Sequence, residues 1–591
     1  MTSKFVLGCL LSSASLILTC LLAGPSESFS AEAKSALKNQ LRRPVALALA
    51  DGGKTLFIAN HRSGTISAID LSTNAVVEIP VGQRLADITL TPDGRYLLTV
   101  DEEANQLVVL ARSESKMEVV HRLAVANAPV CIQISADGKH CFVASLWSRQ
   151  LSVIELKGET NKPIVAKTID LPFAPRKQLL IKDTNKLIVA DSFGGQIGLV
   201  DIEKGTLVSV RRLPAHNIRG LAISPGGKEL LLAHQVLRAE ARSNADDIHW
   251  GNLITNNVRM VPLAAVLTPD GSLTKGARLL ALGDVGKAAG DPAGLAVCPD
   301  GTLLVSTSGT DEVSFGKVNT EDWSRLSVGR GPTAVLVSLD GRQAFVSNTF
   351  ADSVSIVSLV EGRTQAEVAL GPQPDLKRAD RGEILFHDAK LSHDGWLSCH
   401  SCHTDGHTNG LLNDNLSDGT FGTPKRVLTL LGVKDTAPWA WNGSVNDLKD
   451  QIRNSITLTM RGAKPTDEQV KDLEAYLQTL APPPPVKRAG DGADQDSFKR
   501  GHEVFNQRGC AACHPPPIYT SKKGYDVGLT DQSGHATFNP PSLRGVSQGG
   551  PYFHDNSASS LEDVFVRHRH QLKTDLSKQE RADLLDFLRS L

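Results

Sequence analysis

The chain has 591 residues, of which 64 are acidic and 63 are basic, and its net charge is −1. A chain of this length exceeds a single hydrophobic core, which predicts two or more domains. The balanced charge gives no reason to expect nucleic acid as a partner, and 50 Gly and 30 Pro beside 41% hydrophobic residues indicate a folded, turn-rich protein.

The N-terminus predicts an export signal over residues 1–31. Lys4 supplies positive charge, residues 5–23 are largely apolar, and small residues follow at Ser28 to Ala31. A membrane anchor is the alternative interpretation. No later stretch approaches the roughly 18 to 20 apolar residues that span a bilayer. We therefore expect a periplasmic or otherwise exported protein without a membrane span after signal removal.

A turn signal then recurs seven times between residues 42 and 372. Pro92-Asp93-Gly94 and Leu339-Asp340-Gly341 are examples, and each separates two short runs of β-forming residues. The repeats are about 40 to 46 residues apart, except for one gap of 74. One four-stranded blade per repeat predicts an all-β seven-bladed propeller. Segments such as Val346-Ser347-Asn348 resemble the surface-layer type of seven-bladed propeller.

The wide gap predicts an insertion at about residues 234–282, with His234, His249 and Trp250 among polar residues. Insertions in repeat proteins map to a loop on one face. A solvated surface loop is the plain interpretation. There are two alternatives. The insertion docks against the C-terminal part of the chain, or it holds a separate metal or ligand site.

Two Cys-x-x-Cys-His motifs follow, at residues 399–403 and 510–514. The thiols of Cys399 and Cys402, and of Cys510 and Cys513, can form thioether bonds to the two vinyl groups of a haem. The adjacent His403 and His514 then reach the iron. The sequence therefore predicts two covalently bound haem c groups. Of the other cysteines, Cys131, Cys141 and Cys298 are expected to be buried free thiols rather than a disulfide scaffold.

The surroundings of the two motifs are also repeated. Each motif follows a short helix that ends in a phenylalanine, and each half closes on an amphipathic helix, at 467–480 and 577–591. This predicts two all-α cytochrome c-like domains, over 378–480 and 498–591. The segment 481–497 between them begins with prolines and is expected to be an extended linker.

This C-terminal region resembles the bacterial di-haem cytochrome c peroxidase family, which includes the methylamine-utilisation di-haem enzymes. The matching residues are Gly382-x-x-x-Phe386, Ser401-Cys402-His403, Trp441-Asn442-Gly443 and Pro551-Tyr552-Phe553-His554-Asp555. The resemblance implies a peroxidatic haem in the first half and an electron-entry haem in the second. It also implies that Trp441 is an aromatic bridge between them, and that the partners are a small redox protein and hydrogen peroxide.

The family pattern is not complete. The usual methionine ligand of the electron-entry haem is replaced by His568, with His570 nearby, and a solvated role for His568 is the alternative. In the first half, Thr459 stands at the position of the family's catalytic Glu. Met460 follows it and is either the sixth ligand of the first iron or a core residue.

Peroxide cleavage also needs a group that moves protons, and the candidates in the sequence are His407, Asp405 and His554. Two functions remain open. One is a peroxidase-like oxidoreductase that reduces hydrogen peroxide or oxidises a partner through two haems. The other is a non-catalytic electron-transfer cytochrome whose propeller binds a protein or ligand.

Overall fold

The computed structural model describes residues 40–591, apart from 114–115, 159–161, 319, 321–322 and 487–494. The predicted export signal lies outside the described residues. Within the described ranges, no helix combines the length and the apolar character needed to cross a membrane.

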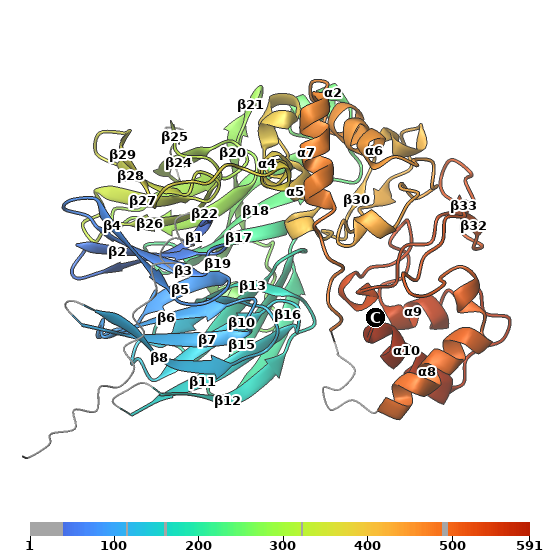
Figure 1. Ribbon diagram of the computed structural model, residues 1–591, viewed down its shortest axis with the longest axis horizontal. Coiled ribbons are helices and arrows are strands. Elements are labelled where there is room, and N and C mark those ends of the chain that lie inside the picture. The colour runs from blue at the N-terminus through green and yellow to red at the C-terminus, as the bar shows by residue number, and fades with distance from the viewer. Residues whose placement is uncertain (1–39, 114–115, 159–161, 319, 321–322, 487–494) are drawn as a thin grey trace, which may run out of the picture.

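Residues 44–369 form the predicted seven-bladed propeller, with one antiparallel sheet per repeat (Figure 1). Six sheets have four consecutive strands, and the fifth blade has five. The strands are, blade by blade: β1 (Pro44–Ala50), β2 (Thr55–Asn60), β3 (Thr65–Asp70), β4 (Ala75–Pro80); β5 (Leu85–Leu90), β6 (Tyr96–Asp101), β7 (Gln106–Arg112), β8 (Met117–Ala124); β9 (Pro129–Ile134), β10 (His140–Ser145), β11 (Gln150–Lys157), β12 (Lys162–Asp170); β13 (Pro175–Leu180), β14 (Lys186–Asp191), β15 (Gln196–Asp201), β16 (Thr206–Arg212); β17 (His216–Ile223), β18 (Glu229–Leu237), β19 (Ile254–Pro262), β20 (Arg278–Asp284), β21 (Lys287–Ala288); β22 (Pro292–Val297), β23 (Thr302–Thr307), β24 (Glu312–Lys317), β25 (Ser324–Ser327); β26 (Pro332–Val337), β27 (Gln343–Asn348), β28 (Ser353–Ser358), β29 (Arg363–Ala369).

The second strand of each blade is apolar on both faces because a neighbouring blade covers each face. In β2, Leu56 and Ile58 pack against the seventh blade, whereas Phe57 and Ala59 pack against the second. This explains why these strands are continuous apolar runs rather than alternating ones. Cys131, Cys141 and Cys298 are buried free thiols in these cores, as predicted.

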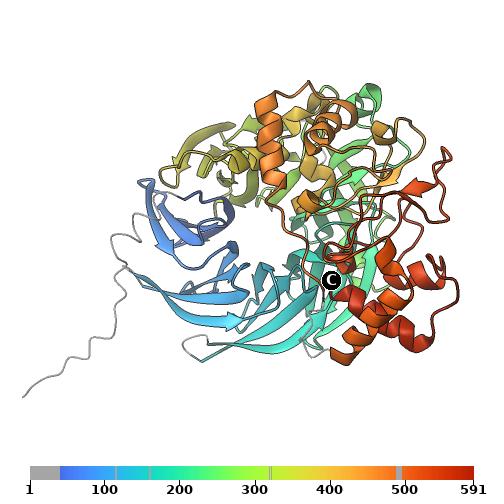
Figure 2. The same ribbon diagram turned by 45° about the vertical axis from the view of Figure 1, so that its right-hand side comes forward.

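The ring closes between its first and last blades, which lie side by side (Figure 2). The buried carboxylate of Asp352 accepts hydrogen bonds from the backbone N–H groups of Arg42 (3.0 Å) and Arg43 (2.9 Å). The hydroxyl of Thr349 donates to the carbonyl of Pro44 at 2.6 Å. These contacts join chain segments about 310 residues apart.

The insertion lies in the fifth blade and contains α2 (Ala245–His249) and α3 (Leu263–Leu267). Its side chains Leu237, Ile248 and Ile254 share one hydrophobic core with Trp396 and Met460 of the first cytochrome domain. Ile248 is fully buried there. The plain interpretation of a solvated loop is therefore wrong, and the insertion docks against the C-terminal region.

The C-terminal region contains two small helical domains. The first consists of α4 (Arg378–Phe386), η1 (Ala389–Leu391), η2 (His393–Gly395), α5 (Cys399–Cys402), η3 (Thr404–Gly406), η4 (Leu416–Asp418), η5 (Val433–Asp435), α6 (Leu448–Asn454), the π-helical turn η6 (Ser455–Thr459) and α7 (Asp467–Leu477), with the short strands β30 (Leu412–Asn413) and β31 (Lys425–Arg426). The second consists of α8 (Gln495–Gln507), η7 (Cys510–Ala512), η8 (Val546–Gln548), α9 (Leu561–Val566) and α10 (Lys578–Arg589), with β32 (Tyr525–Asp526) and β33 (Thr537–Phe538).

Both domains use the same helix crossing. A Cβ placed on Gly382 of α4 would lie 1.9 Å from the carbonyl oxygen of Asp472 in α7, and one on Gly501 of α8 would lie 2.1 Å from that of Asp583 in α10. Only glycine lets these backbones approach so closely. The repeated sequence context therefore corresponds to a repeated structure. The helix α8 begins slightly before the predicted domain start at residue 498.

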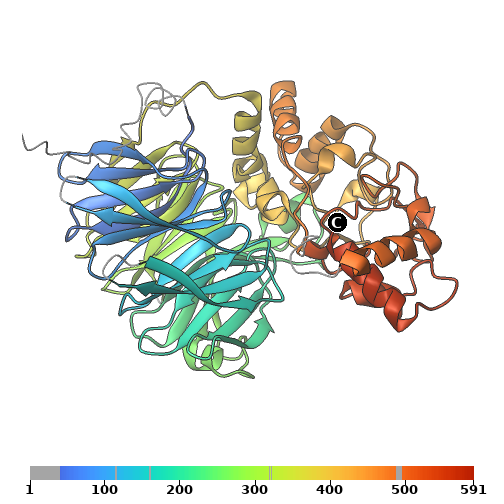
Figure 3. The ribbon, with the colours of Figure 1, turned by 60° about the horizontal axis from the view of Figure 1, so that its bottom comes forward.

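The two cytochrome domains lie along one side of the propeller (Figure 3). One buried side chain, Gln548, joins the parts. Its amide nitrogen donates to the carbonyls of Trp147 in the propeller (2.7 Å) and Pro484 in the linker (3.0 Å). Its amide oxygen accepts from Nε of Arg149 at 3.0 Å, and its backbone carbonyl lies 3.2 Å from Nε2 of His407.

Candidate haem sites

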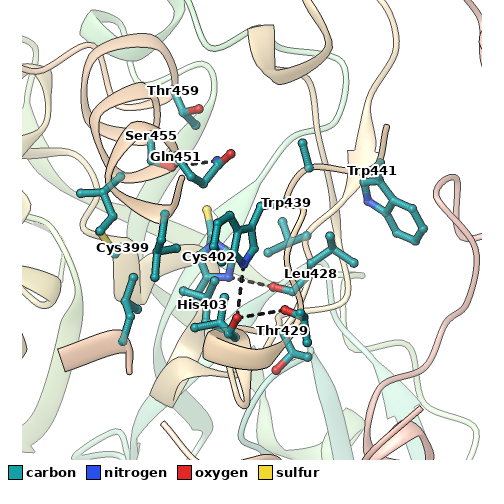
Figure 4. A pocket seen from close by; sticks show the side chains of 18 of the residues that line it. Cys399, Cys402, His403, Leu428, Thr429, Trp439, Trp441, Gln451, Ser455 and Thr459 are labelled. Carbon is teal, nitrogen blue, oxygen red and sulfur yellow. Dashed lines mark hydrogen bonds between the residues drawn. The ribbon is translucent and has the colours of Figure 1, made fainter. Parts of the chain in front are cut away.

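The first Cys-x-x-Cys-His motif forms the short helix α5 and opens onto a cavity lined by Cys399, Cys402 and His403. Nδ1 of His403 lies 2.9 Å from the carbonyl oxygen of Leu428 (Figure 4). This hydrogen bond fixes the tautomer that carries its lone pair on Nε2, as in most metal-bound histidines. Burial lowers the pKa of His403 to about 4, so the imidazole is neutral and suited to bind iron.

The propeller holds this helix from outside. The hydroxyls of Ser398 and Ser401 donate to the buried carboxylate of Asp291, at 2.5 and 2.6 Å. Nε2 of His216 lies 3.0 Å from the carbonyl of Ser401. Burial alone would raise the pKa of Asp291, but the nearby His400 imidazole and the hydrogen bonds from Ser398 and Ser401 outweigh it and lower that pKa. The loop before the sixth blade thus anchors the haem-attachment helix through an ionised carboxylate.

The opposite wall of the cavity comes from α6 and the π-helical turn η6. Gln451, Ser455 and Thr459 lie there, across from His403 (Figure 4). The backbone N–H of Met460 donates to the carbonyl of Ser455 at 2.9 Å, which ends the turn and leaves Met460 buried at the cavity wall. π-Helical turns occur mostly at functional sites because they re-aim the residues that follow.

Cationic side chains also line the cavity, namely Lys425, Arg426 and Arg544. Burial lowers the pKa of Arg426 to about 10, which still leaves it charged. In the part of the chain that the structure describes, the buried Nε atoms of Arg426 and Arg544 have no hydrogen-bond partner. A haem carries two propionate groups, which are suitable acceptors for these donors. The cavity therefore offers a haem two thiols for covalent attachment, an imidazole for its iron and cationic side chains for its propionates.

The cavity reaches from the first cytochrome domain to the second, because residues 539–542 and Arg544 close one end of it. Trp441 lines this end, and its Nε1 donates to the carbonyl of Arg426 at 2.7 Å. Its ring centroid lies 6.3 Å from that of His554, which stacks on Phe538 at 4.2 Å. The predicted bridging residue thus stands between the two domains.

The second motif places Cys510 and Cys513 around the 3₁₀ turn η7. Nδ1 of His514 lies 3.0 Å from the carbonyl of Tyr519, the same arrangement as at His403. Burial lowers the pKa of His514. Both motif histidines therefore present Nε2 to a metal.

The candidate ligands opposite His514 follow α9. The rings of His568 and His570 both pack against Phe553, with centroids 5.1 and 5.3 Å away. Nε2 of His568 lies 3.0 Å from the carbonyl of Ser557. Burial first, and then the neighbouring His514 and His568, lower the pKa of His570 to about 4. The charge of His514 thus acts on His570, whereas Nε2 of His568 is engaged by the Ser557 carbonyl, and His568 as the ligand opposite His514 stays a prediction.

His407 is not among the cavity-lining residues. Its ring packs between Trp147 and Phe193 of the propeller, with centroids 5.7 and 4.8 Å away. Its Nδ1 lies 2.9 Å from the hydroxyl of Thr429, and its Nε2 contacts Gln548. This placement argues for a structural role of His407 rather than the catalytic one considered from sequence.

Asp405 likewise faces the propeller. It forms ion pairs with Arg176 and with Arg219, the latter at 3.0 Å. These contacts order the loop after the haem motif, and neither Asp405 nor His554 lines the cavity.

Family comparisons agree with this geometry. The model of the di-haem cytochrome c peroxidase family matches residues 377–486, and that of cytochrome c matches residues 498–591. The C-terminal module belongs to the di-haem cytochrome c peroxidase family. This membership, together with the fit of the cavity, assigns it two covalently bound haem c groups at the two motifs.

Individual relatives of this peroxidase-family module are moderately similar. The methylamine utilization protein MauG of Methylophilus methylotrophus is 28% identical over 282 residues, covering 36% of this chain and 82% of the relative. Cytochrome c551 peroxidase of Nitrosomonas europaea is 26% identical and covers 36% and 79%. Among solved structures, hydrazine synthase of Kuenenia stuttgartiensis has a TM-score of 0.46 at 23% identity, covering 54% of this chain and 97% of that chain.

Sequence reasoning missed the cationic residues of the peroxidase-family module. Arg544 reaches the first haem cavity from the second domain, and no local motif marks that contact. The one usable signal was the internal repeat, because Leu431-Gly432-Val433 parallels Arg544-Gly545-Val546. Asp291 was also missed, because it belongs to a propeller turn far from the motif it anchors.

Proposed function

We propose that this protein is an exported di-haem oxidoreductase that reduces hydrogen peroxide at the His403 haem with electrons delivered through the His514 haem. A small redox protein is the proposed electron donor. The observation that carries the proposal is the continuous cavity from His403 past Trp441 to the second domain. Two irons supply the two electrons that reduction of one peroxide molecule requires.

The residues of this chain have distinct roles in the proposal. His403 and His514 hold iron through Nε2, and the Leu428 and Tyr519 carbonyls orient them. Trp441, fixed by its hydrogen bond to Arg426, provides an aromatic group between the two centres. The apolar wall of Ile452, Ile456 and Leu473 excludes water from the first site.

Met460 decides whether peroxide can approach the first iron. We propose that its thioether is the sixth ligand in the resting protein, because Met460 is buried, lines the cavity and directly follows Thr459 of the wall across from His403. Replacement by Ala should convert the first haem from low-spin to high-spin and increase the rate of peroxide turnover. Ultraviolet–visible and EPR spectra of the holo-protein in both redox states measure the first effect, and a donor-linked peroxide assay measures the second.

Met260→Ala is the matched control, because Met260 is equally buried but lies in the propeller core. It should leave both haem spectra unchanged. An unchanged spectrum in Met460→Ala would exclude Met460 as a ligand. Absence of peroxide turnover in both the wild type and Met460→Ala would exclude the peroxidase proposal.

One observation favours electron transfer without peroxide chemistry as a second candidate. Among the described residues that line the cavity there is no carboxylate, and His403 is the one histidine. The wall opposite His403 offers the amide of Gln451 and the hydroxyls of Ser455 and Thr459 instead of an acid–base group. This candidate also predicts low-spin spectra for both haems in the resting protein, and it differs from the first in predicting no peroxide turnover, with the propeller serving as a docking surface for a redox partner.

A further inference from the structure

Two histidines and one aspartate gather where the propeller insertion meets the first cytochrome domain. They are His249, the last residue of α2, and His393 and Asp394 of η2. One ligand atom from each lies within 4.8 Å of the other two. None of them lines the first haem cavity, and none belongs to either Cys-x-x-Cys-His motif.

The local backbone directs these side chains toward one another. Asp394 adopts a left-handed conformation with φ of 58°, which is uncommon for a residue other than glycine. On the other side, Gly251 follows α2, and a Cβ on it would lie 2.8 Å from the ring of Trp396, so α2 packs tightly against the segment after η2. The result is a preformed cluster across an interface between two domains.

The distances suit a tetrahedral transition-metal ion. Nε2 of His393 lies 3.5 Å from Oδ2 of Asp394, and Nδ1 of His249 lies 2.6 Å from the same oxygen. Ligand bonds of about 2.0 to 2.1 Å around zinc place neighbouring ligand atoms about 3.3 Å apart. The His393–Asp394 distance already fits a zinc site. The His249–Asp394 distance must lengthen by about 0.7 Å when the ion binds.

The three side chains are also exposed enough for a metal ion to reach them from solvent. The side chains of His249 and His393 are each 39% exposed, and that of Asp394 is 19% exposed. Two imidazoles and one carboxylate suit zinc and copper rather than calcium or magnesium, which prefer oxygen ligands. Water is available to complete the coordination.

We propose that His249, His393 and Asp394 bind one divalent transition-metal ion of the zinc type, which links the propeller insertion to the haem module. The site also contacts the segment that presents Met460. The backbone N–H of His393 donates to the carbonyl of Met460 at 2.9 Å, and Nε of Arg461 donates to the carbonyl of Ser243 in the insertion at 2.7 Å. The ion therefore fastens the interface next to the first haem.

Isothermal titration of the chelator-treated holo-protein with Zn²⁺ tests the proposal. The wild type should bind one equivalent, and His249→Ala and His393→Ala should each weaken the affinity by about 10-fold or more. His61→Ala is the matched control. His61 forms a similar histidine–carboxylate pair with Glu102 at 2.8 Å and is 33% exposed, but has no second histidine beside it in that pair. The His61→Ala variant should bind Zn²⁺ with the affinity of the wild type.

Copper provides an independent readout. The EPR spectrum of the protein with one equivalent of Cu²⁺ should show coupling to two nitrogen ligands, and each single variant should lose one of them. Unchanged haem absorption and circular dichroism identify folded variants, and His393→Gln replaces His393→Ala if the latter fails to fold. Lack of Zn²⁺ binding by the wild type, or equal affinity in the wild type and both variants, would overturn the proposal.

Discussion

At the scale of single residues, His403 and His514 show how the protein prepares an imidazole for iron. Each directs Nδ1 to a backbone carbonyl, at 2.9 and 3.0 Å, so that Nε2 is the available ligand atom. A backbone carbonyl cannot be lost by substitution at one position. The tautomer at both haems is therefore fixed by the fold rather than by a neighbouring side chain.

Thr459 lines the cavity, and the resemblance to the peroxidase family implies that it stands at the position of the family's catalytic Glu. In a Met460→Ala background, Thr459→Glu should increase peroxide turnover by about 100-fold, the scale that a positioned acid–base group contributes. The control is Thr457→Glu, which adds the same charge on the same turn at a residue that does not line the cavity. Equal turnover in the two variants would contradict the assigned position.

Trp441 contributes both an aromatic ring and an Nε1–H donor, and substitution can separate the two contributions. Trp441→Phe keeps an aromatic ring but removes the Nε1–H donor to Arg426, which costs about 1 kcal/mol of stability. Trp441→Ala removes both. Flash-induced electron transfer between the two haems should slow slightly in the Phe variant and strongly in the Ala variant. Equal rates in the wild type and both variants would remove Trp441 from the path.

At the scale of elements, each cytochrome domain depends on one close helix crossing. Gly501→Ala places a methyl group 2.1 Å from the Asp583 carbonyl, so α8 and α10 must separate. The expected loss is about 1 to 3 kcal/mol in the free energy of unfolding. Gly226→Ala, in an open turn of the propeller with no atom within 4 Å of the added Cβ, should change it by less than about 0.5 kcal/mol.

Urea unfolding followed by the haem absorption measures both variants. The Gly501 variant should lose stability mainly in the domain that holds Cys510 and Cys513. A loss of similar size in the Gly226 variant would show that the helix crossing is not the cause.

At the scale of the whole molecule, His407 makes the junction of the domains sensitive to acid. Burial first lowers its pKa from 6.5 to about 3, so the folded protein keeps it neutral. Between these values the unfolded chain binds a proton that the folded chain does not, and stability therefore falls as the pH decreases below 6.5.

This contribution can be isolated by substitution. Unfolding free energies measured between pH 7 and about pH 4 should fall less steeply for His407→Gln than for the wild type. His502→Gln, at an exposed position on α8, should keep the wild-type slope. A slope in His407→Gln that matches the wild type would show that His407 is not the source.

Local chemistry made the blades and the haem motifs predictable from the sequence. Asp-Gly turns specify hairpins within a few residues, and the two motifs carry both thiols and the imidazole within five positions. The place of His407 was not predictable, since its partners Trp147 and Gln548 are distant in sequence. The choice between His568 and His570 as the ligand opposite His514 stays a prediction, because both rings follow α9 and pack against Phe553.

Gln548 affects the distance over which electrons pass between the two haems. Because its one side chain bonds the propeller, the linker and the second domain together, the separation between the redox centres is set by packing and not by the length of the connecting chain. Additional residues between positions 486 and 495 would leave the tunnelling distance as it is.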